Sequence, residues 1–392
     1  MSFANKHIQT AATVIENYTG AVPLHHHLKQ FFAADKKYGS KDRKAIAHAC
    51  YCFYRLGHSL EKISIADKIK AGIFLCTPQP GTWVTAFDEE WIMQWNNKTG
   101  EKISFLQTKH SFDLTTVFPF HQHLSETINK DHFIQSHFIQ PDLYLRIRPG
   151  RKDKVTTQLK QAGIEYALLN DSAVVLPNAT KIDELFRLNK DVVVQDLSSQ
   201  RITAFLNDVD ADEEPLAVWD CCAASGGKSI LAVDVLTKVD LTVSDVRYSI
   251  IQNLKKRFAE AGIDQYNAFV ADIAADTFES PRKTFDLIIC DAPCSGSGTW
   301  SRNPEQLYFF TDEKIRHYSS LQKKIVENII PSVHRNGYLL YITCSVFREE
   351  NEQVVNHILE HSSLVLKKMA VLKGYDNKAD TMFAALFTTS SL

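Results

Sequence analysis

Residues 216–236 read LAVWDCCAASGGKSILAVDVL, and this stretch decides the fold of the C-terminal half of the chain. Its apolar start, 216–219, predicts a strand, and residues 228–236 predict a helix. The glycines between them let the backbone approach a ligand closely, and the first turn of the helix offers unpaired N–H groups. A GxGxxG spacing, which a dehydrogenase would need, is absent. The stretch therefore predicts a cofactor loop between a strand and a helix.

Strand and helix patterns continue to alternate along the rest of the chain. Further strands are expected at 241–244, 268–270, 285–289 and 337–342, and further helices at 249–261 and 313–334. This alternation is typical of a parallel sheet with helices on both faces. We therefore expect an α/β, Rossmann-like domain with a mostly parallel sheet over residues 201–392.

The N-terminal 200 residues show two other patterns. Residues 1–138 carry the apolar stripes of helices, with Ser40 as the expected N-cap of one of them. Residues 139–200 contain strand patterns at 143–147 and 172–176, on either side of a helical pattern at 155–162. We expect an all-α domain over 1–138 and a small α+β (RRM-like) module over 139–200.

The composition is that of a globular protein with two or three domains. The chain has 392 residues, 44% of them hydrophobic, and a net charge of −2. No apolar run approaches the roughly 20 residues that a membrane span requires, and the N-terminus lacks an apolar signal region. The cysteines show no metal-binding spacing, so no metal is expected. The motifs below need free thiols, which predicts a cytoplasmic location.

Two cysteines directly follow predicted strands. Cys294 lies in the sequence DAPCS and Cys344 in the sequence YITCS. Because parallel strands of an open sheet end at the ligand crevice, both thiols are expected there. The proline before Cys294 stiffens its turn and so sets the directions of Asp291 and Cys294. Cys221 and Cys290 are expected to pack in the core.

Two acids follow other strands of the same predicted sheet. Asp245 ends the strand at 241–244, nineteen residues after Gly226, where a carboxylate can accept hydrogen bonds from both ribose hydroxyls of a nucleoside. Asp272 ends the strand that follows. These features alone fit any nucleotide or S-adenosylmethionine fold, and helix capping remains an alternative for Asp245.

A thiol beside a methyl donor indicates one particular reaction. A thiolate that adds to carbon 6 of a pyrimidine turns the ring into an enamine, whose carbon 5 can attack a methylsulfonium. Loss of the carbon 5 proton then expels the thiol. Because a free thiol has a pKa near ~8.5, the attacking cysteine needs a helix N-terminus, a base or a cation nearby.

Three longer motifs carry a family resemblance. They read DCCAASGGKS at 220–229, DAPCSGSGTWSRNPE at 291–305 and YITCSVFREENE at 341–352. With them the chain resembles the NOL1/NOP2/Sun family of RNA cytosine-5 methyltransferases, and most closely the bacterial RsmB-type enzymes of ribosomal RNA. VQDLSSQ at 194–200 is similar to the start of the family's catalytic domain. The N-terminal helices, with GSKDR at 39–43, are similar to its NusB-like RNA-binding domain.

The resemblance implies a role for each matching residue. Cys344 would be the nucleophile, Cys294 would assist product release as the base or near it, and Asp291 would hydrogen-bond the cytosine. The implied cofactor is S-adenosylmethionine. Its implied binding residues are Cys222, Ala223, Ala224, Ser225, Gly226, Gly227, Lys228, Asp245, Asp272 and Asp291.

The chain departs from the family pattern at several positions. Ser225 replaces the proline of the cofactor loop, which is expected to loosen the loop. Ile250 stands where the family usually has an arginine, for which Arg247 is a candidate substitute. Arg148 stands where an asparagine is common, and ADTMF at 379–383 replaces a Gly-Asp-Gly-Phe-Phe signature.

Two basic clusters are candidates for RNA contacts, although the near-neutral chain has no global nucleic-acid signature. A solvated basic face is the alternative for either cluster. The candidate RNA-binding residues are Arg146, Arg148, Arg151 and Lys152 in one cluster and Lys41 and Arg43 in the other.

The sequence thus predicts an S-adenosylmethionine-dependent RNA 5-methylcytosine methyltransferase, with 16S ribosomal RNA as the foremost substrate. Two alternatives stay open: the same chemistry on transfer RNA, and a non-catalytic RNA-binding or ribosome assembly factor. DNA methylation is disfavoured, because those enzymes follow the Pro-Cys of their motif with glutamine, whereas Cys294 precedes a serine. The expected partner is RNA, with no membrane, and the chain is expected to be a monomer.

Overall fold

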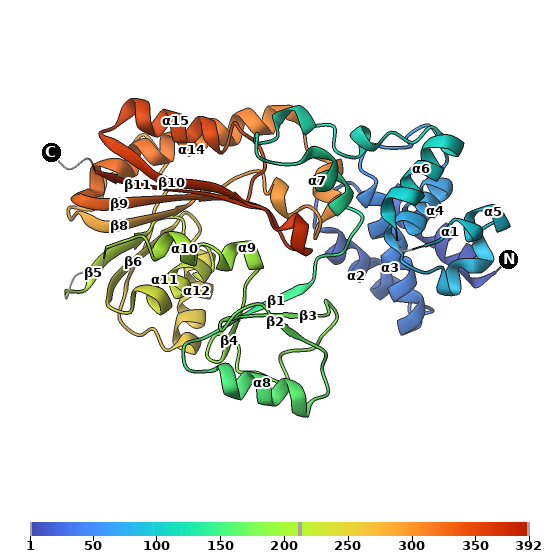
Figure 1. The fold of residues 1–392 in the computed structure, drawn as a ribbon, viewed down its shortest axis with the longest axis horizontal. Helices are drawn as coiled ribbons and strands as arrows, with labels where there is room; N and C mark the ends of the chain where they lie inside the picture. Colours follow the sequence, from blue (N-terminus) through green and yellow to red (C-terminus); the bar gives the residue numbers. More distant parts are fainter. Residues whose placement is uncertain (1, 97, 211–213, 390–392) are drawn as a thin grey trace. The chain divides into compact units, whose positions relative to one another are not determined.

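The computed structural model describes residues 2–96, 98–210 and 214–389, and the chain divides into two compact units (Figure 1). The helical unit contains residues 1–124, 129–140 and 299–312. The sheet unit contains residues 125–128, 141–298 and 313–392. The division of the chain at 138 and 200 into three domains stays a prediction. Across the described residues, no helix has the length and apolar character that crossing a membrane requires.

The helical unit is built from the amphipathic helices that the N-terminal stripes predict. The helices are α1 (Phe3–Glu16), α2 (Leu24–Ala34), α3 (Ser40–Arg55), α4 (Ile65–Cys76), α5 (Glu89–Met93), α6 (Thr99–His110), α7 (Lys130–Ser136) and α13 (Pro304–Tyr308), with 3₁₀ turns η1 (Gly81–Ala86), η2 (Leu114–Val117) and η3 (His121–His123). One detail is corrected: Gly39, not Ser40, is the N-cap of α3. The Gly39 N–H donates to the Asp42 carboxylate at 3.1 Å, which closes the first turn one residue earlier.

The sheet unit contains a small antiparallel sheet over the predicted α+β segment. Its strand order is β2-β3-β1-β4, and α8 supplies Val155 and Leu159 to its core. The elements are β1 (Leu143–Ile147), α8 (Lys152–Gln161), β2 (Ala167–Leu168), β3 (Ala173–Leu176) and β4 (Val192–Val194).

The large sheet has the order β10-β11-β9-β8-β5-β6-β7. The five strands from β9 to β7 are parallel, as expected, whereas β11 and β10 extend the sheet as an antiparallel edge that the sequence analysis did not identify. The strands are β5 (Leu216–Asp220), β6 (Val239–Asp245), β7 (Asn267–Val270), β8 (Phe285–Asp291), β9 (Val333–Thr343), β10 (Leu364–Leu372) and β11 (Met382–Thr389).

Helices cover both faces of this sheet, as Figure 1 shows. One apolar cluster joins the sheet to α10, α11 and α12, and a second joins it to α14 and α15. The helix expected at 313–334 ends earlier, because Pro331 lies in the 3₁₀ turn η5 (Ile330–Ser332) and β9 begins at Val333. The remaining elements are α9 (Leu197–Gln200), α10 (Thr203–Leu206), α11 (Gly227–Leu236), α12 (Tyr248–Ala261), η4 (Ser297–Thr299), α14 (Asp312–Ile329), α15 (Glu352–His361) and η6 (Tyr375–Asn377).

Candidate functional site

The predicted site residues gather at the carboxyl ends of the central parallel strands. β5 lies between β6 and β8, so the strand order changes direction beside it. Such a switch point is where open α/β sheets bind ligands. β5 leads into the glycine loop, while β8 leads to Cys294 and its neighbour β9 leads directly to Cys344. The sheet order therefore brings the candidate cofactor loop and both candidate thiols to one edge.

The glycine loop depends on Gly226 for its shape. Gly226 has a φ of +80° and forms the N-cap of α11. A side-chain carbon on this residue would lie 2.5 Å from the Phe258 ring of α12, so packing and backbone conformation both require glycine. The loop is closed by a hydrogen bond from the Gly226 N–H to the Ala223 carbonyl at 2.8 Å. The unpaired N–H groups in the first turn of α11 therefore point toward the crevice at the carboxyl end of β5.

Ser225, which replaces the family's loop proline, is held by a different contact. The Arg257 guanidinium donates to the Ser225 hydroxyl at 2.8 Å and to its carbonyl at 3.3 Å. Arg257 also donates to the side chain of Asn189 at 2.8 Å, which fixes the direction of the guanidinium. These hydrogen bonds restrain the loop at the position where the proline is missing.

Asp245 lies at the end of β6 beside this loop. Its carboxylate accepts the Ala224 N–H at 3.1 Å and the Arg247 N–H at 3.0 Å, and the Arg247 Nε lies 3.3 Å away. A carboxylate has about four acceptor positions, so these three contacts leave about one for a ribose hydroxyl. Asp272 follows β7, is exposed, and accepts the Ala274 N–H at 3.1 Å. Arg247 thus contacts the Asp245 carboxylate, and its role as a substitute for an arginine at position 250 stays a prediction.

Asp245→Ala is expected to weaken S-adenosylmethionine binding about ten- to a hundredfold, because hydrogen bonds to a charged acceptor contribute roughly 1–3 kcal/mol. Isothermal titration calorimetry measures this directly. Asp240→Ala, at the opposite end of the same strand, is the control and should bind the cofactor normally. Unchanged affinity in Asp245→Ala would remove Asp245 from the cofactor site.

An ion pair connects the cofactor loop to the cysteine motif on β8. The Lys228 Nζ lies 3.0 Å from the Asp291 carboxylate. Lys228 is almost fully buried at the start of α11, while Asp291 is partly exposed at the end of β8. The pair spans the switch point between β5 and β8, and it fixes the Asp291 carboxylate toward the loop.

The two strand-end thiols touch each other. The Sγ atoms of Cys294 and Cys344 lie 3.1 Å apart. The Gly298 N–H donates to the Cys344 carbonyl at 2.9 Å, which holds the Cys294 loop against the end of β9. A side-chain carbon at Gly298 would lie 1.9 Å from the Thr381 carbonyl, so only glycine permits this approach. Both thiols are partly exposed, which leaves them accessible to a substrate.

The environment of Cys294 favours its protonated form. The hydrogen bond with Cys344, together with burial, raises the pKa of Cys294 well above its ordinary value. A protonated Cys294 can donate a hydrogen bond toward the Cys344 sulfur 3.1 Å away.

A buried carboxylate that the sequence analysis did not single out ties the two cysteine loops together. Glu350 is fully buried and accepts the Ser295 N–H at 2.9 Å and the Ser345 hydroxyl at 2.7 Å. Ser295 follows Cys294, and Ser345 follows Cys344. Gln322 of α14 donates to Glu350 at 2.9 Å and to the Pro293 carbonyl at 3.0 Å. In the sequence, Glu350 stands out only as an acidic residue inside the motif at 341–352. The fold was needed to show that its side chain faces the interior.

Glu350→Ala is expected to lower kcat for methyl transfer about a hundredfold, because both cysteine loops lose their shared anchor. The affinity for S-adenosylmethionine should not change, since the cofactor loop lies on the other side of the switch point. Glu350→Gln keeps two of the hydrogen bonds and should recover most of the rate. A parallel loss of cofactor affinity and melting temperature in both variants would show a merely structural role.

Asp220 precedes the cofactor loop and is completely buried. Its Oδ2 accepts the Ser229 hydroxyl at 2.5 Å, whereas its buried Oδ1 has no hydrogen-bond partner among the described residues. Burial raises the pKa of Asp220 from 3.8 to about 7. The folded state therefore favours the protonated acid.

The free energy of unfolding is expected to fall as pH rises from about 4 to about 7, because the unfolded chain releases the Asp220 proton before the folded chain does. Asp220→Asn should remove most of this pH dependence, with roughly 4 kcal/mol as the upper bound. Urea unfolding at pH 5 and at pH 8 measures it. Equal pH dependence in the variant and the parent protein would assign the effect to other groups.

The basic cluster at 146–152 is mostly engaged in ion pairs within the sheet unit. Arg146 is buried and pairs with Asp234, and Arg148 donates to the same carboxylate at 2.9 Å. These ion pairs hold Arg146 and Arg148 within the sheet unit, and their RNA contacts stay predictions. Arg151 and Lys152 are partly exposed at their side chains, as Lys41 and Arg43 are exposed in the helical unit; their RNA contacts stay predictions.

Comparison with known proteins agrees with this geometry. The family model described as "16S rRNA methyltransferase RsmB/F" matches residues 203–385. The chain is 32% identical over 231 residues to a probable ribosomal RNA small subunit methyltransferase B of Bacillus subtilis (strain 168), covering 57% of this chain and 50% of that protein. It is 30% identical over 236 residues to the ribosomal RNA small subunit methyltransferase B of Yersinia enterocolitica, covering 57% and 52%. The chain thus spans about half the length of these relatives.

Solved structures show the same fold. The crystal structure of PH0851 matches with a TM-score of 0.69 at 17% identity, covering 98% of both chains. The structure described as NSun6 from Pyrococcus horikoshii with SFG matches with a TM-score of 0.59 at 14% identity, covering 70% of this chain and 97% of that one. The motif resemblance, the matched segment and the identity to the two bacterial proteins agree. Through residues 203–385, the chain is similar to the 16S rRNA methyltransferases of the RsmB/F family.

Proposed function

We propose that the protein is an S-adenosylmethionine-dependent RNA (cytosine-5) methyltransferase that acts on 16S ribosomal RNA through a covalent cysteine adduct. The contact of 3.1 Å between Cys294 and Cys344, at the strand ends beside a glycine loop, carries this proposal. Two neighbouring thiols suit a reaction that needs one thiolate to add to a base and one group to complete the release. A cytoplasmic location belongs to the proposal, because both thiols must stay reduced.

The residues present fit the proposed cofactor. The loop at 222–228 offers backbone N–H groups at a helix N-terminus, and the Asp245 carboxylate lies at the end of the adjacent strand, as a nucleoside site requires. Asp272 lies at the next strand end, within the same row of carboxyl ends. Bound S-adenosylmethionine would supply an electrophilic methyl group to carbon 5 of the target cytosine.

The protein's own residues would act on the cytosine in sequence. The Cys344 thiolate adds to carbon 6, and electron density moves to carbon 5, which becomes nucleophilic. Asp291, held by Lys228 at 3.0 Å, hydrogen-bonds the ring and stabilises its added form. After methylation, the carbon 5 proton leaves to a base at or near Cys294, and the bond between Cys344 and carbon 6 breaks. Cys344 returns as a thiolate, so the enzyme is regenerated.

The choice of 16S ribosomal RNA rests on the matched family and on the two bacterial relatives, both of them small subunit rRNA methyltransferases by name. The exposed side chains of Arg151, Lys152, Lys41 and Arg43 are proposed to contact phosphates, which would contribute salt-dependent affinity.

Methylation assays with the full chain and tritiated S-adenosylmethionine test this function. Unmethylated 16S rRNA, alone and in 30S particles, is compared with total transfer RNA, and bisulfite sequencing locates any 5-methylcytosine. Transfer to one 16S cytosine is the expected result. Methyl transfer to tRNA alone would show that tRNA, not 16S rRNA, is the substrate. RNA binding without methyl transfer to 16S rRNA, 30S particles or tRNA would favour an assembly factor.

A further inference from the structure

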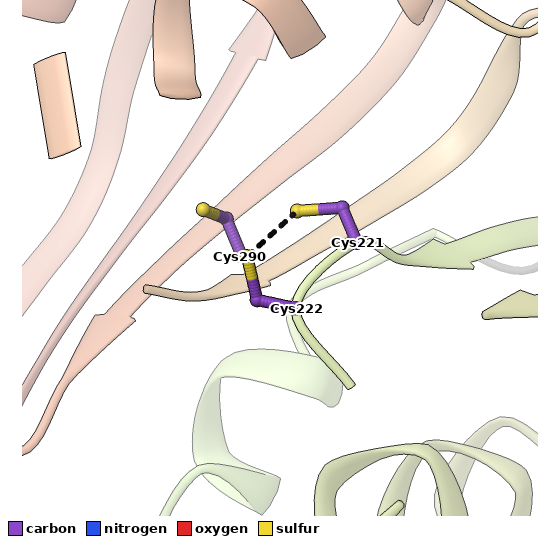
Figure 2. Close-up of side chains that lie close together, drawn as sticks. All are labelled: Cys221, Cys222 and Cys290. Atoms are coloured by element: carbon purple, nitrogen blue, oxygen red, sulfur yellow. Dashed lines mark hydrogen bonds between the residues drawn. The ribbon is translucent and has the colours of Figure 1, made fainter. Parts of the chain in front are cut away.

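Three cysteine sulfurs meet in the sheet unit away from the pair of strand-end thiols. They belong to Cys221 and Cys222, which follow β5, and to Cys290 of β8, and Figure 2 shows their side chains converging. All three Sγ atoms lie within 4.8 Å of one another, and those of Cys221 and Cys222 are 4.0 Å apart. Elsewhere in 2–96, 98–210 and 214–389, no other three such side chains come together in this way. From the sequence alone, Cys221 and Cys290 are expected to pack in the core.

The backbone holds these sulfurs in place. β5 and β8 are paired in parallel, with Asp220 opposite Ile289. The Cys221 N–H continues this ladder and donates to the Ile289 carbonyl at 2.9 Å. Cys221 and Cys290 are buried, while Cys222 is partly exposed and gives the cluster a path to solvent. The cluster is therefore preorganised by two central strands.

The sulfur distances match those of a metal thiolate site. Bonds of about 2.3 Å from one cation to three sulfurs place the sulfurs roughly 4 Å apart, close to the observed separations. Thiolates select soft cations over hard ones such as Mg²⁺ or Ca²⁺. Cys222 is the least buried of the three, so its side chain has the most room to adjust.

The cluster also lies among acidic groups. Asp220 precedes Cys221 in the chain, and Asp291 follows Cys290. Asp220 adds a buried oxygen without a hydrogen-bond partner among the described residues. A bound cation would compensate this concentration of acidic groups, and the thiols would release their protons on binding.

We propose that Cys221, Cys222 and Cys290 form a three-thiolate site for a soft, thiophilic cation. This inference does not depend on the proposed methyl transfer, since none of the three thiols takes part in the proposed steps on the cytosine. Cys222 enters the proposed cofactor site only through its place in the loop at 222–228. Cd²⁺ is a suitable probe, because thiolate-to-cadmium charge transfer absorbs in the ultraviolet in proportion to the number of bound thiolates.

The experiment is a Cd²⁺ titration of the full, reduced chain that carries Cys294→Ser and Cys344→Ser, which removes the competing thiol pair. We expect one bound Cd²⁺ with the absorbance of three thiolates, and a higher melting temperature in its presence. Cys290→Ser should lose one third of this absorbance and weaken binding by at least about ten- to a hundredfold, since even outer-shell changes cost that much. Cys222→Ser serves as the second variant if Cys290→Ser does not fold.

Cys52→Ser in the same background is the matched control, because Cys52 is buried in the helical unit far along the chain from the cluster. It should bind Cd²⁺ as tightly as its parent. Binding that disappears in Cys52→Ser but persists in Cys222→Ser or Cys290→Ser would overturn the proposal. So would the absence of a charge-transfer band in the parent, or a band with the intensity of only one thiolate.

Discussion

Cys344→Ala is expected to abolish methyl transfer, with a loss on the order of 10⁴-fold or more, as removal of a catalytic nucleophile commonly costs. Without the thiolate, carbon 5 of cytosine remains a poor nucleophile and no covalent intermediate forms. Transfer of a tritiated methyl group to RNA measures the rate, and a denaturing gel shows whether an RNA adduct is present.

Cofactor binding should be preserved in Cys344→Ala, because Asp245 and the 222–228 loop are untouched. Cys290→Ala is the control, since Cys290 lies near the same carboxyl edge of the sheet but is buried and outside the pair of strand-end thiols. It should retain methyl transfer. Full turnover in Cys344→Ala would end the thiol mechanism.

Cys294→Ala is expected to attack the cytosine but fail to release it. The variant keeps Cys344, and it loses the neighbouring thiol, 3.1 Å away, that is proposed to complete the reaction. A protein–RNA adduct should therefore accumulate that survives denaturation, while multiple turnover falls to background. Incubation with RNA and S-adenosylmethionine, followed by a denaturing gel, detects the shifted band.

The trapped band in Cys294→Ala must depend on Cys344. The double variant Cys294→Ala/Cys344→Ala is the control and should show no adduct. An adduct in Cys344→Ala together with none in Cys294→Ala would exchange the two roles.

Much of the fold could be predicted from the sequence because its signals are local. Strand patterns 216–219 and 285–289 and the helix at 249–261 agree with β5, β8 and α12 to within a few residues. The backbone conformation and packing of the cofactor loop require glycine at position 226. Cys294 and Cys344 both lie just beyond the ends of strands. Periodicity and turn residues act over neighbouring positions, so they can be read without a partner strand.

The contacts between segments that are distant in the sequence could be known only from the tertiary structure. Arg146 looks like a surface cation in the sequence, yet the fold buries it against Asp234. Glu350 is one acid among several in its motif, but only the packing of α14 and of the two cysteine loops makes it their common anchor. Cys221 and Cys290 meet because β5 pairs with β8.

The sequence alone therefore determined the α/β class, the cofactor loop and the two strand-end thiols, while the tertiary structure decided which side chains share an environment. The physical reason is that strand order and register depend on the sum of contacts across the whole sheet. A local pattern predicts that a strand exists and which residues alternate along it, but not which strand lies beside it. Burial, ion pairing and shifted pKa values depend on which strands and helices become neighbours.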